Sequence, residues 1–258
     1  MWQLFQEVRQ NRELIWALAL KELHVRYKRS VLGFIWALLH PLFMMVILTV
    51  VFSSMVRFPV QKYAVFLISM LLPWTFFAQA LTYCVECLVS NGELLKKVKV
   101  AKSVFPVAVI LSNTINFLLS LFPLALILVV LHFPLHWTWI YLPVPMIGLL
   151  MFVLGCGFFL SAVNVYFRDV SHIVQIVLSA WFYFSPIMFS LELLPQQYRT
   201  LFRLNPMLYI LNGFRLAIYY GQLPTLQSVA ASITIGGITL FLGYSFFRHV
   251  EHTFALYV

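Results

Sequence analysis

The chain carries a run of 65 residues, from Ser103 to Phe167, that contains no Asp, Glu, Lys or Arg. Ordinary soluble domains carry about 25% charged residues, so a charge-free stretch of this length does not suit a soluble fold. The hydrocarbon core of a bilayer is about 30 Å thick, and a helix needs ~20 apolar residues to cross it. The run therefore predicts two membrane crossings joined by a turn at 132–136, where polarity rises and a proline interrupts.

The composition of the whole chain agrees, because 62% of its residues are hydrophobic and only 10% are charged. In lipid the backbone must satisfy its own hydrogen bonds, which restricts spans to helices or a closed barrel. The apolar runs are continuous and do not alternate, which favours helices. We therefore expect a single all-α membrane domain over 1–258 with six transmembrane helices. The expected spans are 31–56, 63–85, 104–131, 139–165, 170–191 and 226–247.

Lys and Arg are distributed unevenly between the two sides that this topology defines. Twelve of the 17 lie with the two termini and five lie on the other side. Cytoplasmic loops carry an excess of Lys and Arg, so both termini are expected in the cytoplasm. The formal charge of +9 then reflects membrane orientation, and no nucleic-acid partner is expected.

Residues 1–30 are too polar to cross a bilayer, yet Trp, Leu and Arg recur there at spacings of three or four residues. This pattern is typical of an amphipathic helix in the membrane interface, with Trp and Leu toward lipid and Arg toward headgroups and water. The helix is either a simple anchor or an anchor that also contacts a cytoplasmic partner. Its periodicity favours neither interpretation over the other.

The segment 89–102 lies between the second and third expected spans. Ser90 or Asn91 is suited to cap a short helix, Glu93 suits its first turn, and the lysines suit its later part. The segment is either a solvated cytoplasmic loop that fixes topology or a short helix that docks into another protein.

The outer segment 192–224 is too short for two crossings and too apolar for a free loop. Proline disfavours helical geometry in the residue before it, so the chain is expected to break at Asn205. We expect two short helices, at Gln196–Leu204 and Pro206–Tyr220, that lie in the outer interface or re-enter the membrane. An amphipathic surface hairpin is the alternative.

Several kinds of chemistry are missing from the sequence. There is no G-x-x-x-x-G-K-[ST] run, so the chain has no P-loop for ATP, and Cys84-x-x-Cys87 lacks the second pair that a metal site needs. None of the eight acidic residues lies inside an expected span, and Glu86 lies just beyond the end of one. This argues against a carrier coupled to protons or sodium. No cluster of Asp, His or Arg indicates a membrane enzyme. We expect no catalytic residue, no metal and no cofactor in this chain, and a conduit powered by another protein.

Aromatic residues are abundant, with 25 Phe, 12 Tyr and 7 Trp, and several fall inside expected spans beside Pro73 and before Pro186. Sugars present C–H faces that stack on aromatic rings while their hydroxyl groups take hydrogen bonds. A passage lined by such rings suits a sliding glycan. The alternative is that the rings pack against lipid and neighbouring helices.

Four motifs, in order along the chain, resemble those of a known family. They are KELHVRYKRSVLGFIW at 21–36 followed by Pro41, NVYFRD at 164–169, SPI at 185–187 followed by Leu194-Pro195, and Asn205-Pro206. Together they resemble bacterial ABC-transporter permeases that export polysaccharides, above all those for O-antigen and teichoic acid.

The resemblance implies six spans, an N-terminal interface helix, two short outer helices and a place in the bacterial inner (plasma) membrane. It implies a homodimer with two copies of a separate cytoplasmic ATPase, which uses ATP and Mg, and a lipid-linked polysaccharide as substrate. A permease for a small lipid or drug, and a non-transporting membrane component of a glycan assembly complex, remain the alternatives.

The resemblance also assigns roles to residues by their position. The residues expected to couple to the ATPase are Arg26, Tyr27, Lys28, Arg29, Asn91, Glu93, Leu94, Leu95, Lys96, Arg168 and Asp169. The rings expected to face the translocation channel are Trp36, Trp74, Phe77, Trp181 and Tyr183. The residues expected to shape the outer gate are Arg203, Asn205, Pro206 and Arg215.

Overall fold

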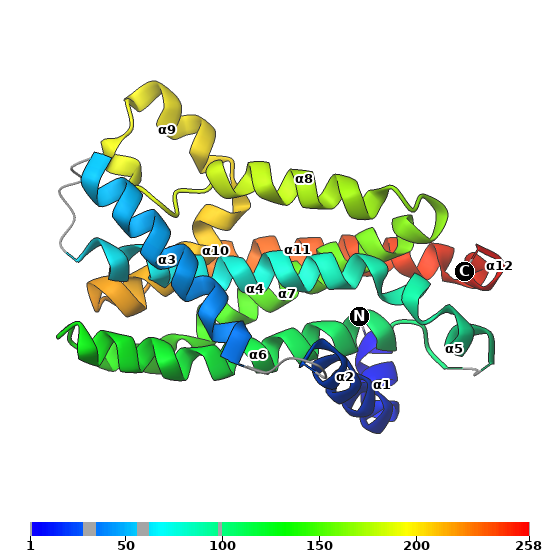
Figure 1. Cartoon of the computed structure of the whole chain (residues 1–258). Coiled ribbons are helices and arrows are strands. Elements are labelled where there is room, and N and C mark those ends of the chain that lie inside the picture. The colour runs from blue at the N-terminus through cyan, green and yellow to red at the C-terminus, as the bar shows by residue number, and fades with distance from the viewer. Residues whose placement is uncertain (1, 28–34, 56–61, 98–99, 258) are drawn as a thin grey trace.

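A computed structural model of the chain describes residues 2–27, 35–55, 62–97 and 100–257 (Figure 1). This part of the chain is helical apart from short connections and contains no β-strand. The α-helices are α1 Trp2–Gln10, α2 Arg12–Tyr27, α3 Ile35–Met55, α4 Tyr63–Ser90, α5 Gly92–Lys97, α6 Val104–Val130, α7 Pro143–Tyr166, α8 Val170–Tyr183, α9 Gln196–Arg203, α10 Pro206–Arg215, α11 Leu226–Val250 and α12 Phe254–Tyr257. Short 3-10 or π segments are η1 Trp137–Tyr141, η2 Leu191–Leu193, η3 Leu216–Tyr220 and η4 Glu251–Thr253.

Within the described residues, four helical segments are long and apolar enough to cross a bilayer. They are Tyr63–Ser90, Val104–Val129, Trp137–Tyr166 and Leu226–Thr253. Two shorter apolar stretches, Leu42–Val51 in α3 and Val170–Tyr183 in α8, accompany them. The prediction of an all-helical membrane protein is confirmed at this level, with four helices that meet the length needed for crossing.

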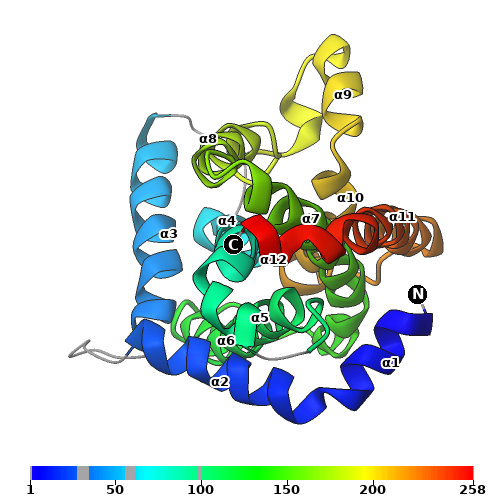
Figure 2. The ribbon, with the colours of Figure 1, turned by 90° about the vertical axis from the view of Figure 1, so that its right-hand side faces the viewer.

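The long helices run side by side, and the short ones gather at the two ends of the bundle (Figures 1 and 2). α5, α12 and the C-terminus lie at one end, called here the α5 end, while α9 lies at the opposite end. α1 and α2 run along one flank, where α2 packs against α6, and α3 packs against α4. α3 and α8 flank α4, a placement that matters for the groove described below.

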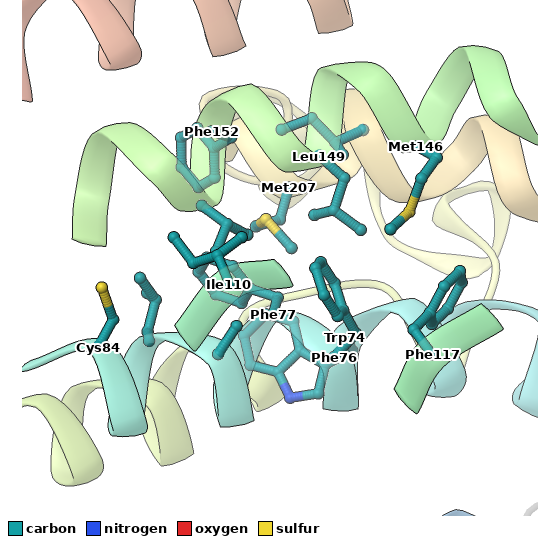
Figure 3. Close-up of a cluster of buried hydrophobic side chains, with 14 of the residues drawn as sticks. Trp74, Phe76, Phe77, Cys84, Ile110, Phe117, Met146, Leu149, Phe152 and Met207 are labelled. Carbon is teal, nitrogen blue, oxygen red and sulfur yellow. The ribbon is translucent and has the colours of Figure 1, made fainter. Parts of the chain in front are cut away.

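α4 is the central helix of the bundle. In its apolar stretch 78% of the residues are buried inside the chain, against 28% for the stretch that contains α11. Figure 3 shows Trp74, Phe76 and Phe77 of α4 among Phe117 of α6 and Phe152 of α7. The ring centroids of Phe76 and Phe117 are 5.4 Å apart, and those of Phe77 and Phe152 are 5.8 Å apart. Such tilted aromatic pairs stabilise helix contacts beyond the area they bury.

Two helix ends show how proline sets the boundaries. α8 ends at Tyr183, although the apolar run predicted a span to residue 191. Pro186 accounts for the early end, because proline disfavours helical geometry in the residue before it. α10 begins at Pro206, as the sequence predicted, and the Asn205 Oδ1 atom accepts a hydrogen bond from the backbone N–H of Met207 at 3.0 Å. Proline suits the first helical position because no N–H is needed there.

Glycines allow α7 and α11 to pack backbone against backbone. A Cβ atom added to Gly243 of α11 would overlap the backbone carbonyl of Gly155 in α7. A Cβ atom added to Gly155 would overlap the backbone of Thr239 in α11. Small residues at helix contacts are the usual means of close approach between membrane helices, where dispersion contacts rather than the hydrophobic effect hold helices together.

We expect Gly243→Ala to destabilise the folded protein in detergent, because the added methyl group forces the two backbones apart. Overpacking of this kind costs about 1–3 kcal/mol. The thermal midpoint, followed by size-exclusion chromatography after heating, measures the effect. Gly237→Ala is the matched control on the same helix, since its Cβ atom would lie 3.5 Å from the flexible Met151 Cε atom. Equal midpoints for the two variants would contradict the close-packing role of Gly243.

Candidate functional site

The short helix α5 presents one polar face and buries the other. Gly92 and Leu95 are buried against the bundle, and Leu94 is half-buried. Glu93, Lys96 and Lys97 are exposed, and the Glu93 carboxylate pairs with Lys97 at 3.3 Å. Leu95 therefore anchors α5, while the charged residues face outward, where another molecule can contact them.

A hydrogen bond joins α2 to the beginning of α5. The Lys21 ammonium group donates to the Asn91 Oδ1 atom at 3.1 Å. The Asn91 Nδ2 group in turn donates to the backbone carbonyl of Cys87 at 2.8 Å, near the end of α4. α2, α4 and α5 are thus linked through one buried asparagine. Lys21 was not among the residues that the sequence singled out, since its partner lies 70 residues away.

Arg26 ties the end of α2 to the bundle. Its guanidinium group donates to the Asn113 Oδ1 atom of α6 at 3.0 Å and lies 4.0 Å from the centroid of the Tyr83 ring of α4. Two further residues of the coupling prediction, Lys28 and Arg29, lie outside the described residues, as does the side chain of Tyr27.

A polar cluster holds α1 against α6 and α11. The Glu7 carboxylate of α1 pairs with Arg248 of α11 at 3.1 Å and accepts a hydrogen bond from the Ser103 hydroxyl at 2.5 Å. Lys102 donates to the backbone carbonyl of Glu251, just beyond α11. Burial lowers the pKa of Lys102, and the nearby Glu251 carboxylate opposes this shift. Sequence reasoning missed Glu7, although it is the one acidic residue of α1.

The turn between α7 and α8 carries Arg168 and Asp169, both exposed. It lies at the α5 end of the bundle (Figure 1). The helix before it is fixed to α4, because the Asn164 amide donates to the backbone carbonyl of Val85 at 3.0 Å. Arg168, Asp169 and the exposed residues of α5 therefore share one end of the molecule, as the coupling prediction requires.

A groove of about 370 Å³ opens between α3, α4 and α8. Its lining combines aromatic rings with hydroxyl and amide groups. The lining residues are Met44, Leu71, Trp74, Thr75, Ala78, Gln79, Thr82, Gln175, Leu178, Ser179, Phe182 and Tyr183. Gln79 and Gln175 were not anticipated from the sequence, in which the aromatic residues alone suggested a passage.

The residues predicted to face a channel do not all border this groove. Trp74 and Tyr183 line it. Phe77 is fully buried, with its ring centroid 5.4 Å from that of Trp181. Trp181 is half-buried behind the groove. The side chain of Trp36 lies outside the described part of the chain.

The segment after α8 loses helical hydrogen bonding, and the Asn205 side chain supplies a donor to one of its backbone carbonyls. Its Oδ1 atom accepts from the Trp181 indole N–H at 2.9 Å. Its Nδ2 group donates to the Phe184 carbonyl at 2.9 Å and to the Ser185 hydroxyl at 3.0 Å. One buried amide therefore fixes both the end of α8 and the start of α10.

Arg215 completes this arrangement from the end of α10. Its guanidinium group is buried, donates to the carbonyls of Pro186 at 3.0 Å and Ile187 at 2.7 Å, and lies 3.7 Å from the centroid of the Phe66 ring. Tyr63 donates to the next carbonyl, that of Met188, at 2.8 Å. We call the side chains of Asn205, Arg215 and Tyr63 the carbonyl clamp.

The predicted gate residues thus have different surroundings. Asn205 and Arg215 belong to the carbonyl clamp, and Pro206 opens α10. Arg203 is exposed at the end of α9, where its backbone carbonyl accepts a hydrogen bond from the Tyr209 hydroxyl at 2.9 Å.

Among the described residues, no group of three or more His, Cys, Asp or Glu side chains is placed to hold a metal ion. Three other features stand out. They are the exposed charged face of α5 at one end of the bundle, the groove between α3, α4 and α8, and the carbonyl clamp that holds the segment after α8.

Comparison with known proteins agrees with the resemblance seen in the sequence. The profile described as ABC-2 type transporter matches residues 13–219. The chain is 30% identical to the O-antigen export system permease protein RfbA of Myxococcus xanthus over 99% of both chains. It is 27% identical to the protein of the same name from Klebsiella pneumoniae over 94% of both chains. It is 25% identical to the polysialic acid transport protein KpsM of Escherichia coli, over 91% of this chain and 92% of that one.

The matched range takes in nearly all of α2 and ends within η3, so it includes the exposed face of α5, the groove and the carbonyl clamp. This chain belongs to the ABC-2 type transporter family.

Proposed function

We propose that this chain is the permease of an ATP-driven exporter that moves a lipid-linked polysaccharide out of the cytoplasm across the inner membrane of a bacterium. The groove between α3, α4 and α8 carries this proposal. It offers aromatic rings beside hydroxyl and amide groups in a chain similar to permeases named for O-antigen export. Rings suit the C–H faces of sugars, and the polar groups suit their hydroxyls.

The proposed topology has six spans, with α3 and α8 added to the four long apolar segments. α3 has 21 residues, and at 1.5 Å per residue it reaches about 30 Å, the thickness of the hydrocarbon core. α8 has 14 residues and reaches about 21 Å, so the non-helical segment after it must complete the crossing. Backbone of that kind is tolerated at depth only where protein covers it. The carbonyl clamp supports this part of the proposal.

The permease works as a homodimer in this proposal. The groove is open along one side, and the helices on its two edges expose apolar side chains such as Phe43 and Ile47 of α3 and Ile176 of α8. A second copy placed against these edges closes the groove into a passage. A two-fold dimer is the commonest symmetric assembly of identical chains.

The energy comes from a separate cytoplasmic ATPase, of which two copies bind the dimer. The exposed face of α5 and the α7–α8 turn form the docking surface, and the bonds through Asn91 pass its movement to α2 and α4. Both termini and the α5 end then lie in the cytoplasm, in agreement with the excess of Lys and Arg there.

The test of the function is co-purification and transport. The permease, solubilised from its native membrane, should bring down a P-loop ATPase, and together in liposomes they should take up a lipid-linked polysaccharide when ATP is added. A purified dimer that neither binds nor stimulates such an ATPase would contradict the exporter function and favour a structural role in glycan assembly.

We expect Glu93→Lys and Leu94→Pro to lower export by about ten-fold, the effect of losing ~1.4 kcal/mol of docking free energy. Glu93→Lys leaves the permease folded, because an exposed i,i+4 pair contributes only about 0.3–0.5 kcal/mol. Polymer uptake and ATPase stimulation are measured in the same liposomes. The control is Glu192→Lys, the same charge reversal at an exposed residue of the outer segment. Normal export by both α5 variants would remove the coupling role from this helix.

The gate role proposed for the outer segment needs a rigid helix break, and Arg215→Met tests it. The substitution leaves two buried carbonyls without their donors, and an unsatisfied buried polar group costs about 1–3 kcal/mol. We expect faster amide hydrogen exchange over 187–205 and a lower thermal midpoint. Arg203→Met is the matched control, because the Arg203 side chain is exposed and takes no part in the carbonyl clamp. Unchanged exchange in the Arg215 variant would show that the break is held by other contacts.

A further inference from the structure

The described residues that line the groove have aromatic, aliphatic and neutral polar side chains. None of the described residues that line it is Asp, Glu, Lys, Arg or His. The chain as a whole holds 17 Lys and Arg, so cations are plentiful elsewhere. The neutrality of the groove is therefore a local property of this surface.

The neutral polar groups of the groove are arranged to accept and donate hydrogen bonds. The hydroxyls of Thr75, Thr82 and Ser179 donate to carbonyls of their own helices, at 2.7, 2.8 and 2.9 Å. Their oxygen lone pairs remain available to accept from a ligand. The amides of Gln79 and Gln175 make no hydrogen bond to another described residue, so each offers both donors and an acceptor to the groove.

Three described cations that contact or directly precede α4 have partners outside the groove. Arg26 is bound to Asn113 and lies over the Tyr83 ring. Arg215 is buried in the carbonyl clamp. Lys62, just before α4, donates to the backbone carbonyls of Leu131 and His132. None of the three lines the groove.

This arrangement suits an uncharged ligand better than a polyanion. Pores that pass anions or phosphates supply rings of Arg or Lys, because an anion that leaves water must be compensated by opposite charge. A sugar hydroxyl exchanges hydrogen bonds with water for hydrogen bonds with amides and hydroxyls at little net cost. The lining also includes the rings of Trp74, Phe182 and Tyr183, of which Tyr183 is exposed and Trp74 is buried. Aromatic rings of this kind suit the C–H surfaces of sugars.

We propose that the polymer exported through this groove is an uncharged polysaccharide, with no carboxylate, phosphate or sulfate in its repeating units. The proposal rests on the proposed function and deepens it by naming the substrate class. It also separates this chain from its relative named for the transport of polysialic acid, a polymer with a carboxylate on every residue.

A comparison of the uptake of two defined polymers tests the substrate class. Liposomes that hold the permease with its co-purified ATPase receive a polymannose or a polysialic acid chain, equal in repeat number and linked to the same polyprenyl diphosphate. We expect ATP-dependent uptake of polymannose to exceed that of polysialic acid by about ten-fold or more, because the groove offers no charge to compensate the carboxylates.

Variants of Gln175 make the comparison sharper, because this side chain lines the groove and is exposed. Gln175→Arg should raise polysialic acid uptake and so lower the ratio of polymannose uptake to polysialic acid uptake. Gln175→Glu, the matched control with the opposite charge, should leave polymannose uptake dominant. Gln175→Glu keeps the length of the side chain, and Gln175→Arg lengthens it toward the groove opening. The amide of Gln175 has no hydrogen-bond partner among the described residues that either variant would lose.

The outcomes separate the two proposals. Equal uptake of both polymers by the unaltered permease, or a ratio that Gln175→Arg does not move, overturns the neutral-polymer inference and leaves the exporter function standing. Uptake of neither polymer, despite a bound and active ATPase, contradicts the proposed function itself.

Discussion

The backbone carbonyls released where α8 ends impose the constraint on which the α9 end of the structure depends. A helix can cross lipid because it pairs its own carbonyls and N–H groups, and each break removes that pairing. Here the carbonyls of Phe184, Pro186, Ile187 and Met188 accept hydrogen bonds from side chains of α10, its cap and α4. The break is therefore a fixed corner that joins α8, α10 and α4.

The buried Arg215 cation at this helix break is stabilised without a carboxylate partner among the described residues. Two carbonyl oxygens and the face of Phe66 surround the Arg215 guanidinium group, and these supply partial negative charge in its plane and above it. Arginine suits the position because its flat fork reaches two acceptors at once, whereas lysine is a compact point charge. The same group that satisfies the backbone also fixes the end of α10 against α4.

The bundle has a rigid part and a less enclosed edge. Glycine contacts lock α7 to α11, and aromatic pairs pack α7 and α6 against α4. By contrast, α3 and α8 expose apolar side chains on the faces away from α4. Exposure of those faces to lipid carries no penalty in free energy, because the lipid tails are as apolar as the side chains. The groove lies between α4, which belongs to the tightly packed part, and the two helices α3 and α8. Its width therefore depends on the positions of α3 and α8 relative to α4.

The sequence predicted the helical class, the positions of α9 and α10, and the break at Asn205, because length of apolar runs and proline chemistry are local properties. It placed Arg215 at a gate but gave no sign of its burial, since a lone arginine usually lies in water.

Trp74 and Phe77 were predicted together to face a channel, yet only Trp74 borders the groove. Two residues three positions apart on one helix have different surroundings when other helices pack against that helix on all sides. The bond from Lys21 to Asn91 joins distant segments and follows from tertiary packing alone.

One helix connects the proposed docking surface to the groove. α4 has 28 residues and a length of about 42 Å at 1.5 Å per residue, so it spans the bundle from the Asn91 contact to the carbonyl clamp. The groove residues of α4 lie between these ends, and Pro73 interrupts its hydrogen bonds among them. Proline is a usual cause of helix bending. Tyr63 fixes one end of α4 at the carbonyl clamp. Pro73 therefore lies between this fixed end and the groove residues Thr75–Thr82 of the same helix.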